Sequence, residues 1–176
     1  MNQGFPKEEP MKKLAVSLLL AVLPLAAGAA DMTTAPAEVE KAVAEEVSRP
    51  FPVGFPNSAN AAHFTGDSYV YPMASSNGVF TANVTFYDGA HTWWHIHRNT
   101  DQILIAGSGI GYVQIEGQPP IRMKEGDVVV VPAGKRHWHG AAPGRTFQHI
   151  SITRKRQNVS TEWISPVENS LYDSLK

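Results

Sequence analysis

Cysteine is absent from the 176-residue chain. The protein can therefore form neither a disulfide nor a thiolate metal site, and any bound metal must be held by imidazole, carboxylate, amide or water ligands. Seven histidines are present. Five of them fall between residues 95 and 149, so imidazole is the ligand that this part of the chain offers most readily.

Charge is sparse and nearly balanced. The chain has 15 basic and 16 acidic side chains, with a formal net charge of -1. The run Arg154-Lys155-Arg156 is too short for a nucleic-acid-binding surface and is typical of a solvated loop. We therefore expect no nucleic-acid partner.

Long apolar runs are also missing, except near the N-terminus. Met11-Lys12-Lys13 precedes the apolar run Leu14–Leu25, and the small residues Ala27–Ala30 follow it. This order is typical of a cleaved signal peptide, and the run is too short to cross a bilayer of about 30 Å. We expect residues 1–30 to be upstream residues and a signal peptide, and the protein to be periplasmic or secreted, as for a bacterial signal peptide, without stable membrane insertion.

The remaining chain has room for one hydrophobic core. Residues 31–60 are expected to form an N-terminal arm, with a helix-like run at Ala37–Val47 followed by a proline-rich stretch that excludes regular structure. Residues 61–176 are expected to form one all-β domain, because short β-rich runs separated by turn residues favour an antiparallel sandwich or barrel. The expected strands are Ser68–Tyr71, Val79–Tyr87, Thr92–His97, Gln102–Ile105, Gly111–Ile115, Asp127–Val131 and Thr146–Thr153.

His95 and His97 are separated by one residue within an expected strand. Residues two apart in a strand project to the same face, so both rings can approach one metal ion. A lone His-x-His pair is also common among packing or surface side chains. The run Gly107–Gly111 has a glycine pattern seen at nucleotide sites, but no helix pattern follows it, and we expect a turn between strands.

Two glycine-framed motifs surround the histidines. In the first, five residues separate Gly89 from His95-x-His97, four more precede Gln102, and six more precede Gly109. In the second, five residues separate Gly126 from Pro132-x-Gly134, and two more precede His137. With this spacing, residues 63–153 resemble the cupin superfamily.

The resemblance implies a jelly-roll β-barrel with a divalent metal held by His95, His97, Gln102 and His137. Gln102 stands where cupins usually have glutamate, and Ala141 where an asparagine is often found. Four neutral ligands leave the charge of the metal uncompensated, which makes it a stronger Lewis acid with a preference for an anionic partner. The alternative is that Gln102 only forms a hydrogen bond within the strand.

A narrower resemblance extends from His63 to Tyr172 and includes the stretch "KRHWHGAAPGRTFQHISI". It is similar to the small bacterial cupins that include the manganese-dependent hydroxynitrile lyases. This implies that His139 and His149 lie near the metal and transfer protons, although His149 as a core residue and His139 as an inert wall residue are open alternatives. The implied pocket residues, most of them also favoured by strand parity, are Ala82, Val84, Phe86, Thr92 and Thr153.

The chain departs from that group in two places. It has one extra residue between His97 and Gln102, and Thr153 stands where a glutamine is expected. The implied activity is cleavage or formation of a cyanohydrin carbon–carbon bond, with manganese as the expected metal and iron, nickel or zinc as alternatives. Other possible functions are a metal-dependent reaction on unsaturated uronate sugars, an Fe(II) dioxygenase, or small-molecule binding without turnover. We expect a small-molecule substrate and a homo-oligomer, a dimer or a tetramer, with His63 and His91 at the surface or a strand edge.

Overall fold

The computed structural model describes residues 35–46, 50–155 and 157–175. The predicted signal peptide and its end near residue 30 lie outside these residues and stay predictions. Among the described helices, none is both long and apolar enough to span a membrane.

The described part of the chain is mostly β-structure, with two short α-helices and one 3-10 helix, η1. The elements are α1 (Ala37–Glu46), β1 (Phe55–Pro56), η1 (Ser58–His63), β2 (Phe64–Thr65), β3 (Ser68–Ser76), β4 (Val79–Phe86), β5 (His91–Thr92), β6 (Trp94–Arg98), β7 (Gln102–Ile115), β8 (Ile121–Lys124), β9 (Val128–Val131), β10 (His137–Ala141), β11 (Phe147–Arg154), β12 (Ser160–Ser165) and α2 (Asn169–Tyr172).

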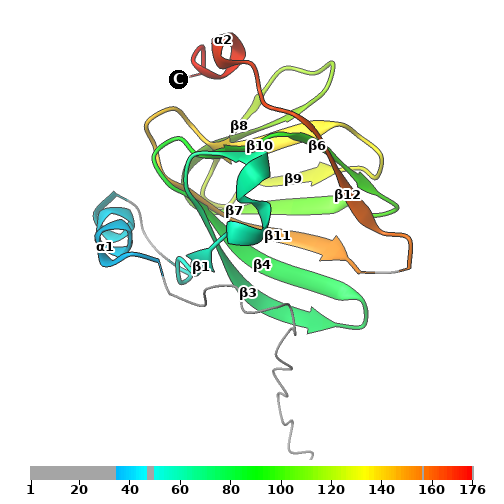
Figure 1. The fold of residues 1–176 in the computed structure, drawn as a ribbon, viewed down its shortest axis with the longest axis horizontal. Coiled ribbons are helices and arrows are strands. Elements are labelled where there is room, and N and C mark those ends of the chain that lie inside the picture. Colours follow the sequence, from blue (N-terminus) through cyan, green and yellow to red (C-terminus); the bar gives the residue numbers. More distant parts are fainter. Residues whose placement is uncertain (1–34, 47–49, 156, 176) are drawn as a thin grey trace, which may run out of the picture.

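The strands pair antiparallel and curl into a jelly-roll barrel (Figure 1). One side contains β1, β3, β4, β11, the first half of β7, and β9. The other contains β2, β5, β10, the second half of β7, and β8, with β6 and β12 continuing from β10. The all-β class and the barrel predicted from the sequence are confirmed.

Strand β7 belongs to both sides of the barrel. The predicted turn at Gly107–Gly111 is wrong, because the chain stays in one strand from Gln102 to Ile115. Gly109 has a φ of 73°, and a Cβ there would collide with the Thr146 carbonyl oxygen. Glycine therefore lets the strand bend from one sheet to the other without ending.

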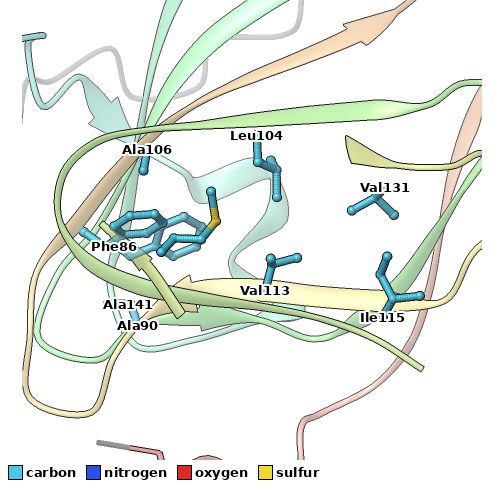
Figure 2. Packing of buried hydrophobic residues seen from close by; sticks show 10 residues of the cluster. Phe86, Ala90, Leu104, Ala106, Val113, Ile115, Val131 and Ala141 are labelled. Atoms are coloured by element: carbon cyan, nitrogen blue, oxygen red, sulfur yellow. The ribbon is translucent and has the colours of Figure 1, made fainter. Parts of the chain in front are cut away.

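A hydrophobic cluster fills part of the barrel interior. Figure 2 shows Leu104 and Val113 pointing toward one another from the two halves of β7. Both side chains are fully buried, as are Phe86, Met123 and Phe147. The alternation of buried and more exposed residues along the first half of β7 is the pattern of a strand with one face on a core.

The N-terminal arm packs on the outside of the β3–β4 side. Helix α1 begins at the predicted residue, and its Val39 and Val43 pack with Val53 and Tyr69. Polar side chains of the sheet hold the chain that follows: Asn83 donates to the Pro52 carbonyl at 3.0 Å, and the Thr85 hydroxyl donates to the Val53 carbonyl at 3.2 Å. The predicted domain boundary between residues 60 and 61 falls inside η1.

The C-terminal segment covers the opposite outer face. Tyr172 donates its hydroxyl to the carbonyls of Gly89 at 2.6 Å and Ala141 at 2.9 Å. Its ring stacks on His91 with centroids 3.9 Å apart. The surface or edge position expected for His91 is wrong, since this covering leaves it 4% exposed.

Candidate metal centre

Two neighbouring strands bring four histidines together. His95 and His97 come from β6, and His137 and His139 from β10, where His137 is the register partner of His95. The ring centroids of His95 and His137 are 4.1 Å apart, and that of His97 lies 5.0 Å from the first and 5.4 Å from the second. The two motifs that are distant in the sequence therefore meet in one cluster.

Backbone carbonyls orient two of these rings. His95 Nδ1 lies 2.8 Å from the Trp93 carbonyl oxygen, and His137 Nδ1 lies 2.9 Å from that of Lys135. A carbonyl only accepts, so each Nδ1 carries the proton and each Nε2 keeps its lone pair. Histidine metal ligands are commonly held in this way, with the remaining nitrogen free to bind.

Gln102 is held with its amide oxygen toward the histidines. Its Nε2 donates to the Ser151 hydroxyl at 2.9 Å, and its Oε1 lies 2.9 Å from His137 Nε2. Because the neutral His137 ring has its proton on Nδ1, two lone pairs face one another across that gap. Such an arrangement suits a cation placed between the two atoms, which is how an amide and an imidazole both serve as ligands.

The protonation states also fit a metal. Burial lowers the pKa of His95 and His97, and it lowers the pKa of His137 to about 4. All three rings are therefore neutral near pH 7, the form in which imidazole binds a metal. The Nε2 atom of His97 is buried without a hydrogen-bond partner among the described residues, and a metal would satisfy it.

Two overlapping ligand sets are present. The set implied by the sequence resemblance is His95, His97, Gln102 and His137. By distance, one ligand nitrogen from each of His95, His137 and His139 lies within 4.8 Å of the other two. Both sets share His95 and His137, and a divalent cation fits this cluster in either case.

His139 and His149 form a buried pair beside this cluster. His149 Nε2 lies 3.1 Å from His139 Nδ1, so one ring donates a hydrogen bond to the other. Burial lowers the pKa of both, that of His149 to about 4, and the charges of neighbouring histidines lower the pKa of His139 further. The two residues are thus a neutral, hydrogen-bonded pair capable of moving a proton.

A pocket of about 230 Å³ opens onto the cluster. Its lining includes the predicted Ala82, Val84, Thr92 and Thr153, together with His95, His97, Gln102 and His139. The predicted pocket residue Phe86 instead belongs to the hydrophobic cluster, fully buried with its ring 5.7 Å from that of His139. Strand parity gives the face of a residue but not its depth along the barrel, and Phe86 is on an inward face but packs within the hydrophobic cluster.

Other lining residues were not predicted from the sequence. They come from the arm, β2, the β3–β4 hairpin and β12, and most are aromatic or polar: Asn57, Asn60, Phe64, Val70, Phe80, Thr161 and Trp163. Trp163 is the register partner of His95, with ring centroids 4.8 Å apart. The alternation in "STEWIS" is the one sequence signal for this strand, because Thr161 and Trp163 lie two residues apart.

Comparisons with known proteins agree with this geometry. The Cupin_2 family, described as "Cupin domain", matches residues 82–150. The chain is 36% identical over 112 residues to a protein of Granulicella tundricola named (R)-mandelonitrile lyase, covering 62% of this chain and 85% of that protein. The chain therefore belongs to the cupin family.

Solved structures show the same fold. A cupin-like protein from Thermotoga maritima superimposes with a TM-score of 0.66 and 32% identity, covering 73% of this chain and 97% of that one. A cupin 2 conserved barrel domain protein from Rhodopseudomonas palustris gives a TM-score of 0.55 at 15% identity, covering 63% of this chain and 76% of that one. The second likeness concerns the fold alone.

Proposed function

We propose that the metal-loaded protein is a hydroxynitrile lyase-like enzyme that cleaves or forms the carbon–carbon bond of a cyanohydrin. The observation that carries the proposal is the 36% identity to the lyase-named relative across 85% of its length. The hydrogen-bonded pair of His139 and His149, with His139 in the pocket wall, supplies the proton-transfer group that this reaction needs.

The metal-binding residues in this proposal are His95, His97, Gln102 and His137, with manganese as the proposed metal. When bound, a divalent metal supplies a Lewis acid for the substrate hydroxyl oxygen. Because these ligands carry no negative charge, a bound metal would give the site a positive potential that would favour the departing cyanide anion.

The chain's own base is His139. Its Nδ1 faces His149 Nε2, so a proton on Nδ1 leaves the lone pair of Nε2 free to accept the proton of the substrate hydroxyl. The carbon–carbon bond then breaks, its electron pair leaves with cyanide, and the carbonyl of an aldehyde forms. Proton transfer from His139 to cyanide completes a redox-neutral reaction.

A cleavage assay with mandelonitrile tests the proposal. Manganese-loaded protein is expected to form benzaldehyde faster than the same concentration of free manganese, and His137→Ala is expected to lose both metal and turnover. His139→Ala is expected to retain metal and lose turnover. Product formation no faster than with free manganese would overturn the lyase assignment, and tight binding without product would favour a binding cupin.

Two further predictions belong to this proposal. A homo-oligomer, either a dimer or a tetramer, is tested by light scattering, which would give a monomer mass if it is wrong. A periplasmic or secreted location is tested by cell fractionation, and retention in the cytoplasm would contradict it.

A further inference from the structure

The N-terminal arm supplies part of the pocket wall. Asn57 precedes η1 and Asn60 lies within it, and both side chains line the pocket that contains His95 and His139. Both residues precede His63, where the resemblance to the lyase-like cupins begins. The part of the pocket wall that Asn57 and Asn60 form therefore lies outside that resemblance.

The geometry of η1 explains why both amides reach the pocket. Residues three apart lie on the same side of a 3-10 helix, so Asn57, Asn60 and His63 share one face. The His63 ring stacks on Trp163 with centroids 4.9 Å apart and an interplanar angle of 5°. Trp163 lines the pocket, so this face of η1 is turned toward it.

Backbone contacts fix η1 at both ends. Asn57 N–H donates to the Ser68 carbonyl and Trp93 N–H donates to the His63 carbonyl, each at 2.9 Å. Immediately before η1, Phe55 and Pro56 pair with β3. The two amides are therefore held on a fixed support, which limits the conformational entropy lost when a ligand binds.

The amides retain hydrogen-bonding capacity. Asn60 Nδ2 donates to Asn57 Oδ1 at 2.9 Å, and Asn57 Nδ2 donates to the Ser68 hydroxyl at 3.3 Å. Each Nδ2 has two hydrogens, so among the described residues each retains one donor, and Asn60 Oδ1 remains as an acceptor. Donor and acceptor side by side match a hydroxyl group, which both donates and accepts.

The pocket beside these amides is aromatic. Phe64, Phe80 and Trp163 line it together with Val70 and Val84. Aromatic side chains pack favourably against an aromatic ring in offset or edge-to-face arrangements. The wall thus combines a surface for an aryl ring with two amides for a polar substituent on that ring.

We propose that Asn57 and Asn60 determine substrate specificity by binding a ring hydroxyl, so that the preferred substrates are hydroxyaryl aldehydes and their cyanohydrins. The assignment of the cyanohydrin group as the reacting end rests on the proposed function, whereas the assignment of the hydroxyl-binding residues rests on the arm. Asn60 is the principal contact because it keeps both a donor and an acceptor.

Calorimetric binding to the metal-loaded protein tests this without turnover. The ligands are 3- and 4-hydroxybenzaldehyde, each compared with the methylbenzaldehyde of the same substitution. We expect one hydroxy isomer to bind about tenfold more tightly than its methyl counterpart, the effect of one or two net hydrogen bonds of about 1 kcal/mol each. Equal affinities within both pairs would overturn the proposal.

Substitutions in η1 and just before it test whether Asn57 and Asn60 cause the hydroxyl preference. Asn60→Ala is expected to abolish the hydroxyl preference and leave the affinity for the methyl compounds within about twofold, and Asn57→Ala to reduce the preference. Ser58→Ala is the matched control, because Ser58 is exposed on the same helix and absent from the main pocket lining, and it should keep the wild-type ratio. An unchanged ratio in a folded, metal-loaded Asn60→Ala protein would disprove the assignment.

The two proposals fail in different ways. A hydroxyl preference that depends on Asn60 in a protein that does not cleave mandelonitrile would support the arm subsite and reject the lyase function. Cleavage of mandelonitrile with no Asn60-dependent preference would support the lyase function and reject the subsite.

Discussion

Two groups of side chains in the barrel interior are equally buried but chemically opposite. In the apolar group, Leu104, Val113 and Phe147 are fully buried and belong to one hydrophobic cluster. In the histidine group, His137 and His149 are also fully buried, yet they face nitrogen and oxygen lone pairs. Burial alone therefore does not distinguish a packing core from a reactive site; the unmatched lone pairs of the histidine group do.

This difference has opposite consequences for stability. Burial of apolar side chains stabilises the fold by about 25 cal/mol per Å² removed from water. Burial of the imidazoles in the histidine group costs free energy unless their polar atoms find partners. In the metal-free protein the apolar group offsets this cost, and a bound metal is expected to return part of it.

The largest expected effect is in the apolar group. Phe147→Ala removes a fully buried ring and should lower the free energy of unfolding of the metal-free protein by about 3–5 kcal/mol, through lost transfer free energy and the cavity that remains. Urea denaturation measures this change.

The comparison variant for this experiment is His149→Leu, two residues along the same strand. Leucine there leaves no large cavity but removes the hydrogen-bond partner of His139 Nδ1, so we expect a loss of about 1–3 kcal/mol. A loss larger than that of Phe147→Ala would show that the two groups do not differ as described.

The second prediction distinguishes between the two candidate metal-ligand sets of the histidine group. His97→Ala is expected to weaken metal binding more than about 100-fold, above the effect of removing an outer-shell partner, whereas His139→Ala should change it by less than about tenfold. Competition with a chelating dye measures both affinities. The reverse order would identify His95, His137 and His139 as the ligand set.

The sequence predicted the barrel because period-two patterns and turn residues are local signals. Strands β4 and β11 were predicted within one residue at each end, because both are rich in β-branched and aromatic residues and lie next to turn residues. Strand β10 was not predicted as a strand, because all five of its residues are buried and "HWHGA" has no alternation. The bend at Gly109 has the same local signature as a turn, and only pairing to both sheets shows that β7 continues.

The candidate site was only partly predictable for a related reason. Spacing and parity placed Ala82, Val84 and His139 on the inner surface, and the structure puts all three in the pocket wall. Depth along the barrel is not encoded in parity, so Phe86 was placed in the pocket although it packs in the core. Asn60 and Trp163 come from segments at opposite ends of the described chain, and their meeting depends on long-range packing.

The third prediction concerns the pH dependence of the metal-free protein. Burial lowers the pKa of His137 and His149 to about 4, below the value of about 6.5 in the unfolded chain. Between pH 4 and 6.5 the unfolded state binds more protons, so the free energy of unfolding rises with pH. The stabilisation is complete above about pH 6.5 and is lost as the pH falls toward 4, with a slope of up to about 1.4 kcal/mol per pH unit for each histidine.

Urea denaturation at pH 4.5, 5.5 and 6.5 measures that slope. His149→Gln should flatten it by the contribution of one group, whereas Phe147→Leu should lower stability equally at each pH. An unchanged slope in His149→Gln would mean that this ring does not titrate below its unfolded value.

The smallest expected effect concerns a residue of β11, the strand that carries members of both the apolar and the histidine group. Ser151 follows Phe147 and His149 on β11 and accepts a hydrogen bond from Gln102 Nε2. Ser151→Ala should cost no more than about 1 kcal/mol of metal-free stability but weaken metal binding about tenfold, because the amide oxygen is no longer held toward the metal. Ser151→Thr keeps the hydroxyl and should restore the affinity. Equal metal affinity in Ser151→Ala and wild type would mean that the Gln102 amide is oriented by other contacts, or that its oxygen is not a ligand.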